Sequence, residues 1–262
     1  MASTGQIDEQ RCAAEAQAFV DGVYERMMER AQAKIGNGRF MRALADGSLP
    51  FETVRLFWLN WHGYVSVVNN FIQCTYHTHY PFFLRFARDL LPTFADKVAD
   101  EITHPEPPGH MLMVWKQGEI FGLTREQMIE YEMLPGCRAY ADYRRGLYHE
   151  GTMAEWWASI ATELYIGHWS RAFREALVRN YSFTDERLPF FTTHEKADLE
   201  VHEGGILPHG LFNRMVLTRL IATGHDQTRP GYSIPYCANT AVDLLALFLD
   251  TCYQESGDPA LR

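Results

Sequence analysis

The sequence predicts an all-α protein that folds as a single domain. Apolar residues recur at helical spacing along most of the 262 residues. Alternation of apolar and polar residues never lasts more than a few positions, and no internal repeat interrupts the pattern. With 47% hydrophobic and 22% charged residues, the chain has the composition of a packed globular protein. We therefore expect residues 1–262 to form one helical bundle around one core.

The N-terminal part is expected to hold four helices separated by glycines and prolines. Residues 8–34 carry an amphipathic pattern that stops before two glycines. A short helix at 41–45 ends in an Asp-Gly-Ser-Leu-Pro turn. The next helix, 53–77, is apolar nearly all round and must therefore be covered on every side. A fourth helix, 82–104, should stop at Pro105, because proline lacks an amide donor and clashes with the preceding turn.

Capping residues mark the helices that follow. One helix should open near His110, beyond the proline cluster. Thr124 and Gln127 have the spacing of a capping box, in which side chains at the first turn satisfy free amides. Thr152 and Glu155 form a second capping box. The remaining helices are expected over residues 152–180, 188–202, 207–223 and 239–254.

Charge and cysteine usage exclude several classes of partner. The net charge of −9 would repel a phosphate backbone, so we expect no nucleic acid partner. The five cysteines are scattered and form no CxxC pair, which favours a reducing compartment over a disulfide framework. No segment has the roughly 18 uninterrupted apolar residues of a membrane span. We expect a cytoplasmic protein with no membrane partner.

Three acidic or imidazole side chains share one helix face near the C-terminal third. His194, Asp198 and His202 are spaced by four residues, which lines them up at about 3.6 residues per turn. An Asp and a His one turn apart can bind the same metal ion. Charged groups also recur on any wet helix, so this motif needs partners elsewhere.

Two further segments supply such partners. Glu101 and His104 form a Glu-x-x-His pair of the kind that binds iron or manganese in helical bundles, but His110 is a rival to His104. Glu163 lies in an apolar stretch, where a carboxylate needs a bound cation, a basic partner or a raised pKa. A salt bridge from His168 is the alternative explanation for Glu163. Oxygen and nitrogen ligands of this kind favour iron or manganese over structural zinc.

Read in order, these segments resemble the haem-oxygenase-like superfamily, which includes thiaminase II, pyrroloquinoline quinone synthase and diiron oxidases. The resemblance covers residues 51–248 and is carried by DEITHPEPPGHMLMVWKQGEIFGLT, MLPGCRAYADYRR and FFTTHEKADLEVHEG. It implies a haem-oxygenase-like multi-helix bundle that usually forms homodimers. The metal ligands that it implies are Glu101, His110, Glu163, Asp198 and His202, with His104 as the alternative to His110.

One position departs from the diiron pattern. Diiron members supply another Glu from the helix that here reads HGYVSVVNNFIQC, where this chain has Ser66, Asn69 or Asn70. The number of iron ions, one or two, therefore stays open. By resemblance, the substrate would be an amino-acid derivative or a fatty acid in natural-product biosynthesis.

The leading hypothesis is a non-haem Fe(II) oxidase or oxygenase that uses O2 on a small molecule. The aromatic segment Phe57 to Tyr64 is a candidate wall for its pocket. The second hypothesis is a metal-free oxidase similar to pyrroloquinoline quinone synthase, with histidines as acids and bases. The third is a non-catalytic helical binding protein. A thiaminase ranks lower because the motif of its nucleophilic Cys is not found.

Overall fold

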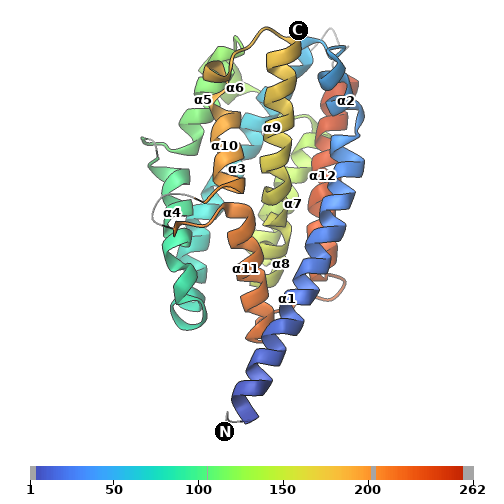
Figure 1. Ribbon diagram of the computed structural model, residues 1–262. Coiled ribbons are helices and arrows are strands. Elements are labelled where there is room, and N and C mark those ends of the chain that lie inside the picture. The colour runs from blue at the N-terminus through green and yellow to red at the C-terminus, as the bar shows by residue number, and fades with distance from the viewer. Residues whose placement is uncertain (1–3, 105, 202–204, 256–262) are drawn as a thin grey trace.

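The computed structural model describes residues 4–104, 106–201 and 205–255, with side chains from residue 12 onward, and contains no strand within these ranges. The helices pack side by side in one bundle, and α1 projects beyond the others at its N-terminal end (Figure 1). The α-helices are α1 (Thr4–Ala31), α2 (Arg39–Asp46), α3 (Phe51–Phe86), α4 (Leu91–Ile102), α5 (His110–Ile120), α6 (Arg125–Glu130), α7 (Pro135–Glu150), α8 (Met153–Ser159), α9 (Glu163–Asn180), α10 (Pro189–Leu199), α11 (His209–Ala222) and α12 (Ile234–Glu255). The all-α prediction is confirmed.

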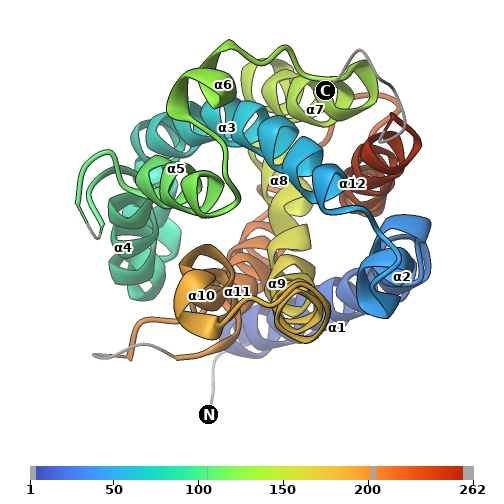
Figure 2. The same ribbon diagram turned by 90° about the horizontal axis from the view of Figure 1, so that it is seen from above.

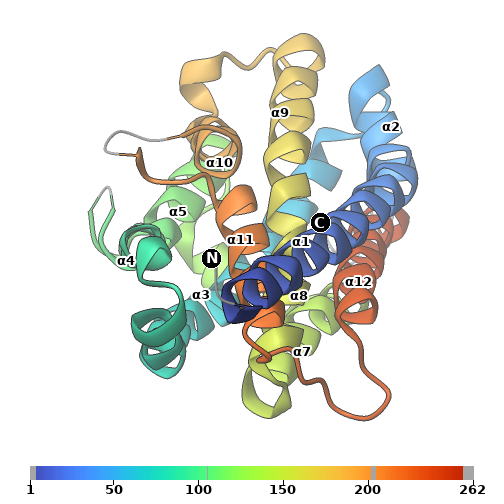
Figure 3. The same cartoon turned by 60° about the horizontal axis from the view of Figure 1, so that its bottom comes forward.

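Segments that are far apart in sequence lie next to one another in the bundle. Helix α9 packs against both α10 and α2, and α7 packs against both α3 and α12. Seen from above, α4, α5 and α10 lie on one side of the molecule and α2 and α12 on the other (Figure 2). Helix α1 crosses α11 and α12 at the bottom of the bundle (Figure 3). The first helix, α1, and the last two helices, α11 and α12, therefore pack against one another on one side of the core.

The core is rich in aromatic rings. Trp58, Phe173 and Phe191 are all fully buried, and the rings of Phe173 and Phe191 stack with centroids 4.8 Å apart. Burying each such side chain contributes about 2–3 kcal/mol. Helix α3 supplies many of these residues, which explains why its sequence lacks a polar face.

Helix α3 is longer than predicted. We expected separate helices over residues 53–77 and 82–104, but α3 continues through Pro81 to Phe86. A short 3-10 turn then leads into α4. Phe82 and Phe83 are buried, so tertiary packing holds the helix together despite the one hydrogen bond that proline removes.

Both predicted capping boxes are present. The side chains of Thr124 and Thr152 each accept a hydrogen bond from the amide three residues later, and the side chains of Gln127 and Glu155 accept one from the amides of Thr124 and Thr152. The helix predicted over residues 152–180, however, is interrupted by the 3-10 turn Ile160–Thr162. Near this turn, the side chains of Ser159 and Thr162 donate to carbonyls three residues earlier and so compete with the regular helix bonds.

Helix α7 (Pro135–Glu150) was not predicted, and α10 ends at Leu199, before the predicted end at residue 202. The other boundaries lie within about five residues of the predicted ones. Helix α5 begins at His110, as expected. Helix α12 begins at Ile234, five residues before the predicted start at residue 239. Among the described residues, no helix is long and apolar enough to cross a membrane.

Candidate active site

A cavity of about 490 Å³ opens between α3, α4, α5, α7, α9, α10 and α11. Its apolar wall includes Trp61 and Tyr64 of the predicted aromatic segment, whereas Trp58 of the same segment belongs to the core. The charged and imidazole side chains that line it are Asp96, Lys97, Asp100, Glu101, His104, His110, Arg144, Glu163, His194, Lys196, Asp198 and His209. Most of the predicted site residues therefore reach the same interior space.

Glu101 and His110 form a buried pair at one side of the cavity. His110 Nδ1 lies 2.8 Å from Glu101 Oε2. Burial opposes ionisation of Glu101, but the charge and hydrogen bond of His110 outweigh it and lower the pKa of Glu101 to about 2. His104 instead lies 3.0 Å from Asp100, and its side chain is 55% exposed. The fold thus brings His110, and not His104, to Glu101.

Of Ser66, Asn69 and Asn70, the three residues found where the resemblance expects another Glu, only Asn69 lines the cavity. Asn69 Nδ2 donates to the backbone carbonyl of Glu101 at 3.1 Å, and Asn69 Oδ1 is buried with no hydrogen-bond partner in the described part of the chain. Ser66 and Asn70 are bonded to carbonyls of their own helix. Asn69 is therefore the residue of the three that faces Glu101 and the cavity.

Glu163 has a basic partner that the sequence analysis missed. Lys97 Nζ lies 2.6 Å from Glu163 Oε2, and Asn213 Nδ2 donates to the same oxygen at 2.7 Å. Burial raises the pKa of Glu163, but the nearby ammonium outweighs it and holds the pKa below its usual value. His168 is exposed, so the proposed salt bridge from His168 is wrong. The interruption before α9 places Glu163 at the first turn of that helix.

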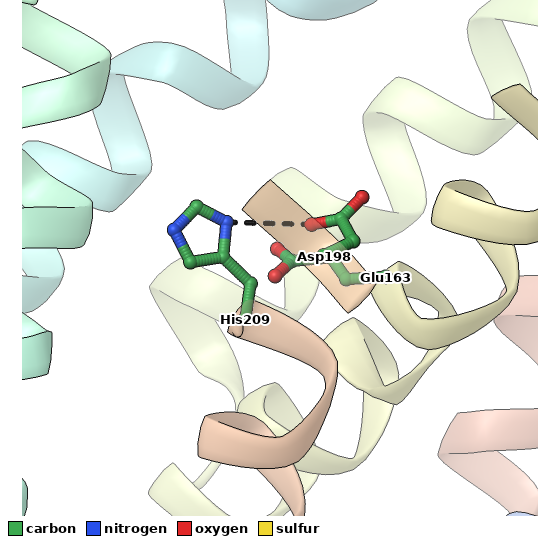
Figure 4. Close-up of side chains that lie close together, drawn as sticks. All are labelled: Glu163, Asp198 and His209. Carbon is green, nitrogen blue, oxygen red and sulfur yellow. Dashed lines mark ion pairs between the residues drawn. The ribbon is translucent and has the colours of Figure 1, made fainter. Parts of the chain in front are cut away.

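Asp198 and His209 complete a cluster with Glu163. His209 Nδ1 lies 3.3 Å from Asp198 Oδ1, and ligand atoms of all three residues lie within 4.8 Å of one another (Figure 4). Asp198 Oδ2 is buried and has no hydrogen-bond partner among the described residues, and burial raises the pKa of this carboxyl. Gly167 permits this arrangement because a Cβ there would lie 2.8 Å from Asp198 Cβ.

The predicted helix motif also contains His194 and His202. His202 lies outside the described residues. His194 is stacked on Phe190, with ring centroids 4.0 Å apart, and its ring lies 4.7 Å from that of His110. Burial lowers the pKa of His194 to about 3, so this imidazole is neutral at physiological pH.

Three residues of the cavity, Lys97, His209 and Asn213, were not predicted from the sequence. Lys97 precedes Glu101 by four residues, which places both on one face of α4, so its spacing was a usable signal. His209 and Asn213 come from α11, which follows the predicted motif after a loop. No spacing rule connects them to Glu163, and only the tertiary fold brings them together.

Among the described residues, Glu163, Asp198 and His209 bring ligand atoms close enough together to hold one metal ion. Three carboxylates and two imidazoles, from Glu101, His110, Glu163, Asp198 and His209, line the cavity. Asp198 Oδ2, His110 Nε2 and His209 Nε2 are buried and have no hydrogen-bond partner within the described ranges, which is costly unless something binds them. The ligand types suit iron or manganese.

Comparison with known proteins identifies the architecture. No protein-family model matches the sequence, and no curated protein matches it. The structure is similar to a TenA homologue from Pseudomonas syringae pv. tomato, with a TM-score of 0.62 and 14% identity over 88% of this chain and 91% of that one. It is also similar to a domain with a heme oxygenase-like fold from Shewanella denitrificans, with a TM-score of 0.64 and 14% identity over 88% and 90%. This chain has the haem-oxygenase-like fold.

A third structure agrees with this identification. A TenA homologue from P. horikoshii has a TM-score of 0.60 and 16% identity over 90% of this chain and 98% of the other. The resemblance stated from sequence is therefore confirmed as a haem-oxygenase-like fold. At these identities the similarity concerns architecture.

Proposed function

We propose that the protein is a non-haem iron oxidase or oxygenase that uses O2 on a small molecule bound in the central cavity. The observation that carries this proposal is the convergence of buried carboxylates and imidazoles from separate helices. Three buried ligand atoms, His110 Nε2, Asp198 Oδ2 and His209 Nε2, have no hydrogen-bond partner among the described residues. The residues that would hold Fe(II) are Glu101, His110, Glu163 and Asp198, with His209 added by the structure and His202 kept from the sequence prediction. A cytoplasmic homodimer remains our expectation.

The side chains that line the cavity would have different roles in binding the ion and the substrate. Carboxylates neutralise the charge of the ion, and imidazoles anchor it. When bound, Fe(II) supplies the ability to activate O2. Trp61 and Met113 line the cavity with apolar surface that limits water near the reacting atoms. Lys97 balances the charge of Glu163 and competes with a metal ion for its Oε2.

Anaerobic titration with Fe(II) tests this proposal. We expect saturable binding of one or two ions in the wild type. Glu163→Gln and Asp198→Asn should each weaken it by about tenfold or more, since each removes one charged ligand. Glu119→Gln is a matched control, because Glu119 is an exposed carboxylate paired with Arg125. The proposal is wrong if the wild type binds no Fe(II), or if all three variants bind it equally well.

A metal-free oxidase is the second candidate, and the Lys97–Glu163 pair favours it. An ammonium 2.6 Å from Glu163 already supplies the positive charge that a buried carboxylate needs. In this case Lys97 and the imidazoles of His110 and His209 would move protons while O2 acts as the oxidant. Once a substrate is found, the two candidates differ in one measurement. Activity that survives dialysis against a strong chelator supports the metal-free reaction, and activity restored only by Fe(II) supports the iron enzyme.

A further inference from the structure

Lys97 on α4 is a buried cation among the candidate metal ligands. Its side chain is 4% exposed, and its Nζ lies 2.6 Å from Glu163 Oε2. The negative charges of Glu163, Glu101 and Asp198 all stabilise the ammonium. Glu101 follows Lys97 by four residues, so both side chains lie on the same face of α4. The ammonium therefore interacts with the same carboxylates that are proposed to attract a metal ion.

The candidate ligands fall into two groups with different geometry. Glu163, Asp198 and His209 bring ligand atoms within 4.8 Å of one another (Figure 4). Glu101 and His110 form the second group, and they already contact each other at 2.8 Å through Oε2 and Nδ1. Among the described residues, only the first group has ligand atoms close enough together to hold one ion.

The charges at the centre of the cavity balance with one divalent ion. Glu101, Glu163 and Asp198 carry three negative charges when ionised, and Lys97 carries one positive charge. With neutral imidazoles, one Fe(II) makes this set neutral, whereas two would leave an excess of positive charge. A protonated His110 would only enlarge that excess. Unbalanced charge at a buried site is costly, so the charges favour a single ion.

The other polar residues that line this part of the cavity do not change this balance. Asn69, which donates to the backbone carbonyl of Glu101 at 3.1 Å, is neutral. Asp96 and Asp100 line the cavity as well, but both are partly exposed, and Asp100 lies 3.0 Å from His104. Water and ions screen charges in such positions, so these two carboxylates compensate less for charge at the buried centre.

We infer that the cavity holds a single metal ion and that the ammonium of Lys97 takes the place of a second one. The inference rests on the proposed function and narrows its ligand set. The residues that would hold the ion are Glu163, Asp198 and His209. Lys97 Nζ and Asn213 Nδ2 both bond to Glu163 Oε2, so Oε1 is the oxygen that the ion would use.

Electrostatic repulsion is the physical reason for the exclusion. The ammonium and a second divalent ion would compete for Glu163 Oε2 and Glu101, and water screens their repulsion poorly at a buried site. Moving Lys97 away would not remove the cost, because a buried ion pair that loses one partner leaves an uncompensated charge. Lys97 is in this view a positioning residue that sets the number of ions.

Counting bound Fe(II) per chain tests the inference. Each protein is dialysed anaerobically against a series of Fe(II) concentrations, and the bound iron is measured colorimetrically. We expect one ion in the wild type. Lys97→Ala removes the charge and opens space, so it should bind two, the second using His110 Nε2, which has no hydrogen-bond partner among the described residues. Lys97→Arg keeps the charge and should stay at one.

Three further variants locate the ion and control for the loss of a lysine. Asp198→Asn should weaken binding by about tenfold or more, because it removes a charged ligand. Glu101→Gln should keep one ion and lose less affinity than Asp198→Asn. Lys116→Met should bind as the wild type does, because Lys116 forms an exposed pair with Glu106 outside the cavity.

The possible results separate this inference from the proposed function. Two ions in the wild type overturn the inference and leave the proposed function standing, whereas no bound Fe(II) refutes the proposed function and the inference with it. One ion in a folded Lys97→Ala shows that Lys97 does not exclude the second. A larger loss in Glu101→Gln than in Asp198→Asn contradicts the ligand set. If Lys97→Ala does not fold by circular dichroism, Lys97→Gln replaces it, and the wild-type count and the Glu101→Gln comparison still decide.

Discussion

Lys97 Nζ lies 2.6 Å from Glu163 Oε2 inside the cavity where the sequence predicts a metal ion. The side chain of Lys97 is only 4% exposed, so the ammonium depends on its carboxylate partners. Burial lowers the pKa of Lys97, but Glu163 and Glu101 outweigh it and keep the pKa above its usual value. The fold therefore places the ammonium of Lys97 among the residues that would hold the proposed metal ion.

Replacing Lys97 should destabilise the metal-free protein. Lys97→Met leaves Glu163 buried without its charge partner, which costs about 3 kcal/mol in the free energy of unfolding. Urea denaturation measures this loss. Co(II), used as an air-stable substitute for Fe(II), should recover part of it, because a bound cation would take over the role of the ammonium.

Lys116→Met is the control for this experiment. Lys116 forms an exposed pair with Glu106, whose loss should cost less than about 1 kcal/mol. If Co(II) stabilises the wild type and Lys97→Met equally, the ammonium and the metal ion do not share Glu163. If Lys97→Met is as stable as the wild type, the buried pair is not the structural element described above.

The close contact of α9 and α10 at Gly167 should be sensitive to a single methyl group. Gly167→Ala would place a Cβ 2.8 Å from Asp198 Cβ and from Leu199 Cγ, so α10 must shift. We expect a loss of about 1–3 kcal/mol in unfolding free energy and weaker metal binding, because Asp198 moves with the helix. Calorimetry and metal titration measure the two effects.

Gly146→Ala is the matched control. Gly146 also lies in a helix, and a Cβ there meets nothing within 4 Å. Alanine should stabilise the protein slightly, by up to about 1 kcal/mol, because it favours helices over glycine. Unchanged metal binding in Gly167→Ala would show that the position of Asp198 does not depend on this contact.

His79 predicts a dependence of stability on pH. Burial lowers the pKa of His79 to about 4, and its neutral Nδ1 accepts a hydrogen bond from Trp157 Nε1 at 3.2 Å. The unfolded chain binds this proton near pH 6.5, so the stabilisation is present above 6.5 and is lost as pH falls from there towards 4. The loss should amount to up to about 3 kcal/mol.

The measurement compares the wild type with His79→Gln by urea denaturation between neutral pH and about 4. The difference in unfolding free energy between them should shrink as the pH falls. His77 is exposed on the same helix, so His77→Gln should follow the wild type throughout. A constant difference between wild type and His79→Gln would show that His79 does not titrate in this range.

The five cysteines should separate into two classes with a thiol reagent such as DTNB. Cys12 and Cys74 are exposed, whereas Cys137, Cys237 and Cys252 are buried. Two thiols should therefore react quickly in the native protein, and the other three only after unfolding. Rapid reaction of a third thiol would indicate that the contact between α7 and α12 opens, because Cys137 belongs to α7 and Cys237 and Cys252 belong to α12.

The sequence predicted the fold class and the capped helix starts well because these depend on local patterns. Thr124 and Thr152 satisfy amides a few residues away, and the same geometry holds in any helix. The continuation of α3 through Pro81 was not predicted, because it depends on tertiary packing and not on a local pattern. The burial of Phe82 and Phe83 among distant helices decides that α3 continues there.

The candidate site was predicted in part for a similar reason. Glu163 was found because an acidic residue in an apolar stretch demands an explanation, although the partner is Lys97 and not His168. His209 could not be found, since it approaches Asp198 only through the packing of α11. The choice between His104 and His110 beside Glu101 also needed the path of the chain around the proline loop.

The 3-10 turn Ile160–Thr162 limits where the length of this chain can change. A helix advances by about 100° per residue, so inserting or deleting one residue before Glu163 would rotate its carboxylate out of the cavity. Helix α9 cannot slide to compensate, because Gly167 holds it against α10. The loop at residues 223–233 joins α11 to α12 outside any helix, and within it Arg229 is the residue that donates to the buried carboxylate of Glu155. Attempts to insert new segments into this bundle should therefore use that loop and keep the residue count of the turn unchanged.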